Sequence, residues 1–470
     1  MLDVTEASAR STAANDGATN PAACVTGRTT ETASCRRRVL IVTFFYPPGH
    51  ETGTLRPLKF SKYLREFGWE PSILTVDPGR YEARDEALSA EVPSGISICR
   101  NPCFDAKRTF AIRGRYPGFL AVPDRYASWL PFGVAATVRL ARRQRIDVLL
   151  STSPTATSHL IAMCAKRLLG VPWVADFRDP WGADLHGRLR SPVERWLERK
   201  VIGRADRITA TTPEIRDYYQ RRYGEFVGTK TTIIYNGYDE SDFEEVAEVA
   251  PTTSEFVIVH SGCLYPDYRS PEPFLRAVRR AFDAGTLPRD MRVTFLAPGD
   301  FGASPAFAGL VAELGLQECV QVTPRLPYGD GLRAIAGASA LLLLQGGDEL
   351  GPCIPNKAFE YLRVGRPILT IAPAESATAR FMRQFDGVSV AHPTDLHDIA
   401  LKLSEVYRWS RQSGTSGERR REQIARYSRR GAAEQLAGVL DALASPHAAV
   451  ATALERHRSG HAAEHGEALP

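Results

Sequence analysis

The residues best suited to chemistry in this 470-residue chain lie between positions 341 and 369. Four leucines at 341–344 predict a buried strand, a glycine pair and Asp348 follow it, and Pro355 is a residue type favoured at helix starts. Lys357 and Glu360 are three residues apart in that helix, so their side chains share one face. The carboxylate could accept both hydroxyls of a ribose and the lysine could bind phosphate. The alternative is a surface ion pair between the two.

A second candidate loop follows the apolar run 39–44 and leads into a helix predicted from residue 55. Gly53 allows a ligand to approach the backbone closely, and the free amides at the helix start, beside Thr54, favour a phosphate. Arg56 could reinforce that charge. The loop lacks the G-x-G-x-x-G pattern, so a plain dinucleotide site is not indicated. The alternative is an ordinary turn from strand to helix.

A third group of polar residues follows the strand predicted at 171–175. Asp176 or Asp179 could accept a proton from a substrate hydroxyl. Arg178 could contact a phosphate or pair with one of the two aspartates. The alternative for all three is an internal ion pair that shapes the loop.

A fourth group follows the strand predicted at 255–260, where Gly262 is succeeded by Arg269. A glycine at a strand end followed by a cation suits a diphosphate, which an arginine can bind through two parallel hydrogen bonds. The alternative is a surface arginine in a turn.

Several familiar motifs are absent. The chain has no D-x-D pair of carboxylates, the usual means of bridging a diphosphate to a metal ion, so we expect no metal and no cofactor, and cations and amides in their place. Walker, H-E-x-x-H and G-x-S-x-G motifs are missing, and the eight cysteines include no Cys-x-x-Cys pair. These absences exclude the P-loop, zinc-protease and serine-hydrolase classes.

Short apolar runs alternate with helical patterns, which predicts an α/β protein with parallel sheets. The alternation restarts after position 237, so we expect two Rossmann-like domains facing a cleft, where the carboxyl ends of the strands gather ligands. The predicted divisions are a disordered leader at 1–35, domains at 36–235 and 255–430, a hinge at 236–254, a further helix at 431–444, and a disordered tail at 445–470.

The charge balance bears on partners. The net charge is only +5, which does not indicate a nucleic-acid partner. Residues 36–150 nevertheless hold 19 Lys and Arg against 11 Asp and Glu, and the segment 107–145 mixes basic and aromatic residues. We interpret it as a surface for an anionic membrane, the alternative being an ordinary solvated surface. No apolar run is long enough to span a bilayer, so we expect a cytoplasmic protein, peripheral at the inner face of the plasma membrane.

Taken in order, these segments resemble bacterial glycosyltransferases of the family 4 type, which have the two-Rossmann (GT-B) fold. The resemblance runs from about Arg38 to Leu443. It is carried by Tyr46-Pro47-Pro48 through Gly53 to Arg56, Asp176 to Trp181, Ile234 to Asp239, Ser261-Gly262, Pro355 to Leu362, and Gly365 to Leu369.

The resemblance implies transfer of a hexosyl group from a nucleotide-sugar to an acceptor sugar, and the missing D-x-D favours a reaction without a metal. The basic and aromatic segment 107–145 leads to the further hypothesis that the acceptor is a lipid-linked sugar in surface polysaccharide synthesis. It places Gly53 at the donor phosphates, Glu360 on the ribose, and the helix at 431–444 back across the first domain. Of the two cations that clamp the diphosphate in many members, Arg269 is kept and the other position is Cys263. A glutamate common in the family is here Pro352, for which Asp348 or the adjacent glutamate could substitute.

Two alternatives share the fold. One is a nucleotide-sugar epimerase, which would convert the donor with no second substrate. The other is a non-catalytic member that only binds a nucleotide.

Overall fold

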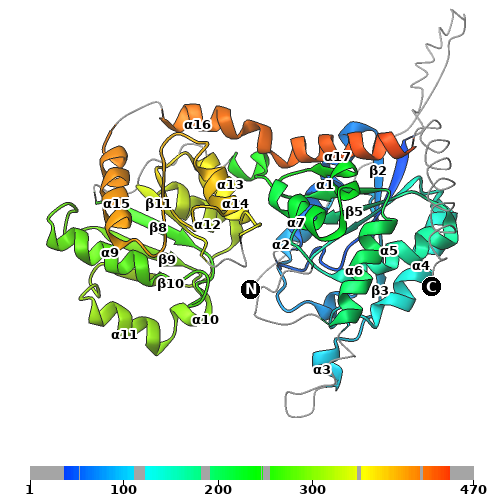
Figure 1. Cartoon of the computed structure of the whole chain (residues 1–470), viewed down its shortest axis with the longest axis horizontal. Coiled ribbons are helices and arrows are strands. Elements are labelled where there is room, and N and C mark those ends of the chain that lie inside the picture. Colours follow the sequence, from blue (N-terminus) through cyan, green and yellow to red (C-terminus); the bar gives the residue numbers. More distant parts are fainter. Residues whose placement is uncertain are drawn as a thin grey trace, which may run out of the picture. The chain divides into compact units, whose positions relative to one another are not determined.

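A computed structural model describes residues 36–444, except for 52, 111–121, 182–190, 245, 247–254, 347–350 and 413–415. Within this part of the chain the strands form two sheets in which every paired strand is parallel. Helices connect successive strands (Figure 1). The prediction of an α/β protein built from two Rossmann-like domains is therefore confirmed.

The first sheet has seven strands in the order β3-β2-β1-β4-β5-β6-β7. Their bounds are β1 (Arg37–Val42), β2 (Trp69–Val76), β3 (Ser97–Asn101), β4 (Val148–Thr152), β5 (Trp173–Phe177), β6 (Arg207–Ala210) and β7 (Thr231–Ile233). β1 is the switch point, since the chain moves outward from it to β2 and β3 and then returns to β4 on its other side. Ligands of such sheets bind beside the carboxyl ends of the strands at this point.

The second sheet has six strands in the order β10-β9-β8-β11-β12-β13. Their bounds are β8 (Val257–Ser261), β9 (Arg292–Leu296), β10 (Val320–Thr323), β11 (Ala340–Leu344), β12 (Ile368–Ile371) and β13 (Val388–Ala391). The switch point here lies between β8 and β11, which both precede candidate site residues.

Helices cover both faces of the first sheet. One face packs against α4 (Trp129–Gln144), α5 (Ala156–Leu169), α6 (Pro192–Arg204), α7 (Pro213–Tyr223) and the short α8 (Phe226–Thr229). The other face packs against α1 (Leu55–Tyr63), its 3₁₀ extension η1 (Leu64–Phe67) and α17 (Arg429–Ala444). The short α2 (Ala87–Ala90) and α3 (Ala106–Phe110) flank β3 in the chain.

The second sheet is covered in the same way. Its helices are α9 (Glu272–Asp283), α10 (Gly299–Gly302), α11 (Pro305–Glu313), α12 (Tyr328–Ala336), α13 (Asn356–Val364), α14 (Ala377–Met382), α15 (Leu396–Ser410) and α16 (Ser416–Ile424). A short 3₁₀ turn, η4 (Glu240–Phe243), follows β7 and packs its Phe243 into this second core.

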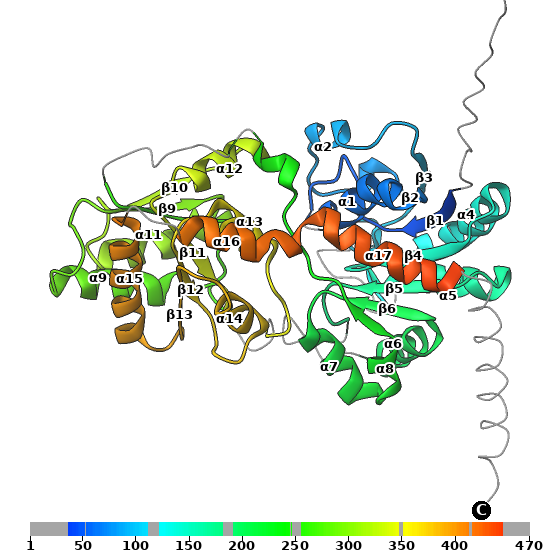
Figure 2. The same ribbon diagram turned by 90° about the horizontal axis from the view of Figure 1, so that it is seen from above.

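The last helix behaves as the resemblance implied. α17 lies beside α1 (Figure 2), and its buried face, which includes Ala433, Leu436 and Leu440, joins the core of the first sheet. The indole N–H of Trp69 on β2 donates to Asp441 at 2.7 Å. Burial of such side chains stabilises the packing by roughly 1.5–3 kcal/mol for each large one.

Local sequence explains the element boundaries. α6 begins with a capping box, in which Ser191 accepts from the amide of Glu194 and Glu194 accepts from the amide of Ser191. α13 ends at Gly365, whose φ of 83° is the left-handed conformation that glycine adopts freely at a helix end. β3 and β13 were not predicted from the sequence. Both are short strands at a sheet edge, and β3 is mostly half-buried, so neither forms a long apolar run.

Candidate functional site

The end of β8 brings a glycine and a lysine together. Gly262 has a φ of 107°, which side chains rarely tolerate, and a Cβ added to it would meet Lys357 Nζ at 2.8 Å. Lys357 lies in the first turn of α13, so its ammonium covers the backbone at the strand end. The positive φ favours glycine at position 262, and the absence of a side chain there lets the lysine ammonium lie against the backbone.

A buried histidine completes the surroundings of this lysine. His260 Nδ1 lies 2.9 Å from the carbonyl oxygen of Leu342, to which it can only donate, so the neutral ring presents Nε2 as an acceptor. That Nε2 lies 3.5 Å from Lys357 Nζ. Burial and the nearby lysine hold the pKa of His260 well below its usual value. The ring is therefore neutral and adds no charge to the site.

Lys357 itself is half-buried and forms no ion pair with a carboxylate among the residues that the structure describes. Burial, followed by repulsion from Arg269, lowers its pKa to about 7. Two cations that repel each other at the end of a strand favour a bound anion, which would relieve both the repulsion and the loss of solvation.

Arg269 is held beside this point by the loop after β8. Its Nε donates to Gln345 Oε1 at 3.2 Å, directly after β11. Its guanidinium lies 5.9 Å and 6.0 Å from the ring centroids of Tyr265 and Tyr268, whose rings stack on each other. The amide of Gly346 donates to the carbonyl of Tyr268 at 2.7 Å, which fixes the loop to the neighbouring strand end.

Cys263 lies in the same loop and its side chain is exposed. It stands next to Gly262, and a Cβ on Gly299 would lie 3.2 Å from its sulfur. A ligand that covers this loop would therefore shield the thiol from solvent.

Glu360 lies one turn further along α13, is half-buried, and has a specific hydrogen-bond donor. The hydroxyl of Tyr328 lies 3.1 Å from Glu360 Oε1 and 3.2 Å from Asp242 Oδ2, so one hydroxyl stands between two carboxylates. Burial raises the pKa of Glu360, and the bond from Tyr328 opposes that rise. Lys357 and Glu360 do not form the surface ion pair that was the alternative interpretation of this helix, since no N···O contact within 4 Å joins them.

In the first sheet, the loop between β1 and α1 is tightly built. A Cβ on Gly53 would meet the ring of Phe45 at 2.4 Å, so this position requires glycine. Thr54 precedes α1 and is buried, and its hydroxyl has no hydrogen-bond partner in the described part of the chain. Arg178 donates from Nη1 to the carbonyl oxygen of Gly53 at 3.0 Å, and this hydrogen bond fixes the position of the loop.

Arg56 points away from this loop into the core, where it meets Asp176. Its Nε donates to Asp176 Oδ2 at 3.0 Å and its Nη2 to Asp176 Oδ1 at 2.8 Å. The remaining donors go to the carbonyl oxygens of Ile234 and Tyr235 and to Asn236 Oδ1. All five N–H groups of the guanidinium are thus engaged by the protein.

Asp176 is saturated in the same way. Besides Arg56, Thr152 and Thr209 donate to its two oxygens at 2.7 Å and 2.6 Å. Burial alone would raise its pKa, but Arg56 and these hydrogen bonds hold the pKa below its usual value. The geometry argues against Arg56 as a phosphate contact and against Asp176 as a base. Asp176 does form an internal ion pair, but with Arg56 and not with Arg178 as the alternative interpretation had it.

Asp179 is the half-buried carboxylate of this strand end. Cys353 donates from its sulfur to Asp179 Oδ1 at 3.3 Å. The adjacent carbonyl of Pro352 accepts from the hydroxyl of Thr212 at 2.6 Å. The position of the missing family glutamate is therefore occupied by a backbone contact, and Asp179 stays the candidate base.

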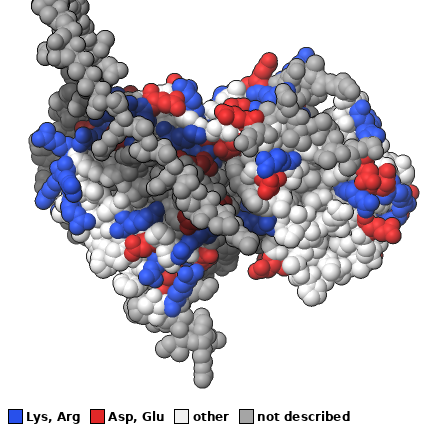
Figure 3. All heavy atoms as spheres, turned by 180° about the vertical axis from the view of Figure 1, so that it is seen from behind, with Lys and Arg blue, Asp and Glu red and all other residues white. Residues whose placement is uncertain are grey.

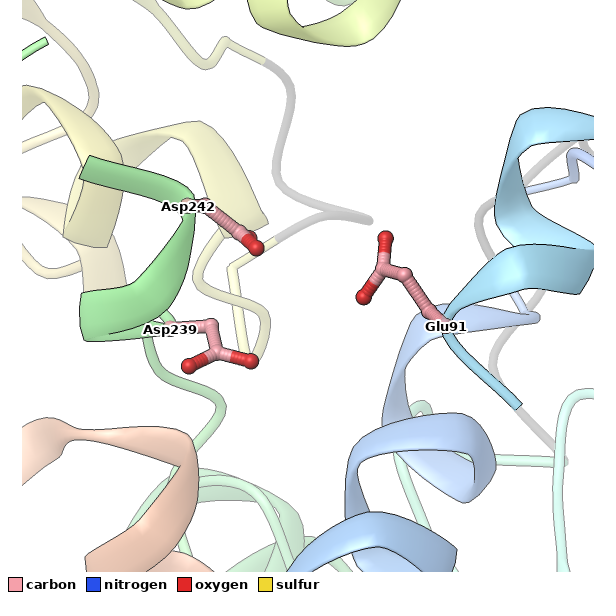
Figure 4. Close-up of side chains that lie close together, drawn as sticks. All are labelled: Glu91, Asp239 and Asp242. Atoms are coloured by element: carbon pink, nitrogen blue, oxygen red, sulfur yellow. The ribbon is translucent and has the colours of Figure 1, made fainter. Parts of the chain in front are cut away.

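Three carboxylates lie close together outside these loops: Glu91, Asp239 and Asp242 (Figure 4). Their arrangement would suit a cation, but Lys59 Nζ lies 2.5 Å, 2.7 Å and 2.9 Å from their oxygens. Burial alone would raise the pKa of Asp239, yet Lys59 lowers it to about 2. Lys59 thus occupies the place that a bound cation would take and, together with Lys62 at 3.3 Å from Asp239, offsets two of the three negative charges. Asp242 connects the cluster to Tyr328.

One predicted residue, Asp348, lies outside the described residues. Three contributors escaped prediction: His260, Gln345 and Tyr328. The first two are the last or next residue of predicted strands, and that position was a usable signal. Tyr328 has no such signal, because it begins a helix remote in sequence from Glu360.

Comparison with known proteins supports this description. The family profile described as a glycosyl transferase 4-like domain matches residues 56–237. A search of curated proteins found no match. Among solved structures, a glycosyltransferase from Rickettsia africae shares 12% identity at a TM-score of 0.59, covering 87% of this chain and 99% of its own.

Two further structures bear on the alternatives. HepE of Anabaena, solved in complex with UDP, shares 14% identity at a TM-score of 0.59, covering 86% of this chain and 100% of its own. A protein described as a UDP-N-acetylglucosamine 2-epimerase of Listeria monocytogenes shares 11% identity at a TM-score of 0.55, covering 87% and 96%. The fold is shared by transferases and epimerases alike.

These findings confirm the resemblance to family 4-type glycosyltransferases and the GT-B fold. The family match supports a transferase. In the described part of the chain, no helix has both the length and the apolar character required to cross a bilayer.

Proposed function

We propose that this chain is a metal-independent glycosyltransferase, which moves a hexosyl group from a nucleotide-sugar to an acceptor hydroxyl. The observation that carries the proposal is the pair of cations, Lys357 and Arg269, at the end of β8, with Glu360 one turn away on the same helix. This spacing suits a nucleoside diphosphate, with its phosphates on the cations and its ribose on the carboxylate. HepE, which has the same fold, was solved with UDP.

In the reaction, the bond between the sugar's anomeric carbon and the β-phosphate oxygen breaks, and its electron pair stays on the phosphate. Lys357 and Arg269 stabilise that charge as it develops, which is the work a metal ion does in other transferases. The acceptor oxygen forms the new bond to the anomeric carbon. Its proton goes to Asp179 if the configuration is inverted, or to the departing phosphate if it is retained.

For the acceptor, the proposal is a sugar linked to a lipid at the inner face of the plasma membrane, as in surface polysaccharide synthesis. Its support is the excess of Lys and Arg over Asp and Glu between residues 36 and 150. An anionic bilayer attracts such a surface.

The donor site is tested first by thermal stabilisation with UDP, GDP and dTDP in the presence of EDTA. We expect one nucleotide to stabilise the wild type, and Lys357→Met and Glu360→Gln to lose that shift. Lys402→Met, a lysine on α15 paired with Asp398, is the matched control and should respond as the wild type does. A shift that appears only when Mg²⁺ is added would contradict metal independence.

Cys263 offers a second readout that needs no turnover. Maleimide labelling of this exposed thiol should be slowed by the stabilising nucleotide and by no other, because the phosphates would cover the loop. Labelling at an unchanged rate would place the nucleotide elsewhere.

Product analysis separates the three enzymatic possibilities. Transfer to an added acceptor supports the proposal, whereas conversion of the donor alone into an epimer identifies an epimerase. Tight binding with neither product indicates a non-catalytic member.

A further inference from the structure

Three helices on one face of the first sheet have an unusual charge distribution. α4, α5 and α6 contain three, two and four Lys or Arg respectively, and their only acidic residues are Glu194 and Glu198 on α6. Both glutamates are buried: Glu194 caps its helix and Glu198 accepts from the hydroxyl of Tyr223. Solvent therefore meets cations on these helices and no carboxylate.

Most of these cations are exposed and have no carboxylate partner. Arg139, Arg142 and Arg143 on α4, Arg167 on α5, and Arg199 and Arg204 on α6 are all exposed. Within the described ranges, none of the six forms an ion pair. On the face seen from behind in Figure 3, patches of Lys and Arg are scattered among uncharged residues, and Asp and Glu lie beside several of them.

The same helices expose large apolar side chains. Trp196 is 56% exposed, Val193 54%, Phe132 42% and Leu168 61%. Trp196 is also the single exposed tryptophan of the six in the chain, all of which are described. The ammonium of Lys200 lies 5.6 Å from the centroid of its ring, so aromatic and cationic groups are interleaved on the surface.

The direction of the helices orders these groups. Each helix runs back from the carboxyl edge of the sheet to its amino edge, because it connects parallel strands. Phe132, Val193 and Trp196 lie in the first or second turns and so stand on the side of the carboxyl edge, whereas Leu168 lies in the last turn of α5, on the side of the amino edge. Arg142 and Arg204 lie in the last turns of α4 and α6, on the side of the amino edge.

We propose that this α4–α6 face, defined by the six arginines and four apolar side chains above, docks on an anionic lipid membrane. The arginines complement the charge of the headgroups, and the tryptophan and its apolar neighbours insert at the level where amphipathic rings are favoured. A phosphate polymer would satisfy the arginines but would leave the apolar side chains in water. The biological purpose of this docking rests on the proposed function: it would bring the carboxyl edge of the sheet close to a lipid-linked acceptor.

Sedimentation with vesicles tests the charge. We expect binding to phosphatidylglycerol vesicles at low salt and none to phosphatidylcholine vesicles. The double variant Arg142→Glu/Arg199→Glu should bind at least roughly 25-fold more weakly, since each cation near an anionic surface contributes about fivefold. Arg280→Glu/Arg408→Glu, two exposed arginines of α9 and α15, is the matched control and should bind as the wild type does.

Quenching by brominated lipids tests the orientation. Trp196 should be quenched when the protein binds, because the other tryptophans are buried or half-buried. Trp196→Phe should keep the binding and lose most of the quenching. Quenching that persists in this variant would place another face on the membrane and overturn the proposal.

Other results would also overturn it: no binding to anionic vesicles at low salt, equal binding to neutral ones, an equal loss in the control variant, or binding to heparin alone. Nucleotide stabilisation and Cys263 protection are measured on the same double variant. If they persist while vesicle binding is lost, the docking face has been found and the donor site is intact. If vesicles bind but no nucleotide does, the proposed function fails and the docking face stands.

Discussion

Two buried or half-buried cations, one beside each sheet, differ in how the protein satisfies them. Arg56 in the first domain donates all five N–H groups to protein acceptors. Its partner Asp176 accepts four hydrogen bonds. Lys357 in the second has no carboxylate partner in the part of the chain that is described, and after burial the main cause of its lowered pKa is another cation, Arg269. The first arrangement is complete without a ligand, whereas the second is not.

This difference separates structural charges from binding charges. A saturated pair holds strands together and has no donor left for a substrate, so its removal should act on folding. An uncompensated cation costs folding free energy, and a protein recovers that cost when the group loses its proton or when an anion binds. The predictions below test whether the two sites behave in these opposite ways.

The largest expected effect is on stability, from Asp176→Asn. The substitution leaves the guanidinium of Arg56 buried without its counter-charge, which should lower the free energy of unfolding by about 3–5 kcal/mol. Denaturant unfolding measures it. Asp330→Asn, which breaks the exposed pair with Arg333, is the control and should cost at most about 1 kcal/mol.

If Asp176 were instead the catalytic base, Asp176→Asn would fold normally and lose transfer alone. That outcome would remove the contrast between the two sites.

Lys357→Met should give the opposite result. We expect unchanged or higher stability, because a desolvated charge that repels Arg269 is removed, together with a loss of nucleotide affinity of about 1.5–3 kcal/mol. Calorimetric titration with the stabilising nucleotide measures the affinity, and denaturant unfolding of the free protein measures the stability. A strongly destabilised variant would show that Lys357 has a structural role like that of Arg56.

The pH dependence sharpens the same point. Lys357 has a pKa of about 7 in the fold against 10.5 for the unperturbed group, so the unfolded chain binds the extra proton between these values. Its contribution to the stability of the free protein therefore rises with pH over that range. A diphosphate favours the protonated lysine, so nucleotide affinity should be highest below pH 7 and fall by up to roughly tenfold per pH unit above it.

Lys357→Arg is the control for this profile, because an arginine stays protonated throughout the range. Its affinity should be nearly flat from pH 7 to 9. A wild-type affinity that is equally flat would mean that Lys357 is not the titrating group.

The same two sites show which features could be predicted from the sequence and which could not. Apolar runs located most of the strands, and the spacing of Lys357 and Glu360 correctly placed both on one helix, since these are local properties. The direction of Arg56 is not local: its carboxylate lies 120 residues away, and a loop that ends in Gly53 and Thr54 looks the same whether the arginine points outward or inward. The burial of Glu194 and Glu198 could not be predicted either, because the sequence of a helix rich in charged residues does not show which of them face the core.

The smallest effect is expected from a substitution of Tyr328, which tests whether its hydroxyl positions Glu360 in the second site. Tyr328→Phe removes the hydroxyl that stands between Asp242 and Glu360, without changing the shape of the ring. Loss of one hydrogen bond of about 1 kcal/mol should raise the KM for the nucleotide-sugar about fivefold and leave kcat nearly unchanged. Because this bond also lowers the pKa of Glu360, the pH at which affinity begins to fall on the acid side should move upward. Tyr407→Phe, a half-buried tyrosine of the same domain, should do neither. An equal loss of kcat and of stability in Tyr328→Phe would mean that the hydroxyl supports the fold of the second domain, and that Glu360 is oriented by its helix alone.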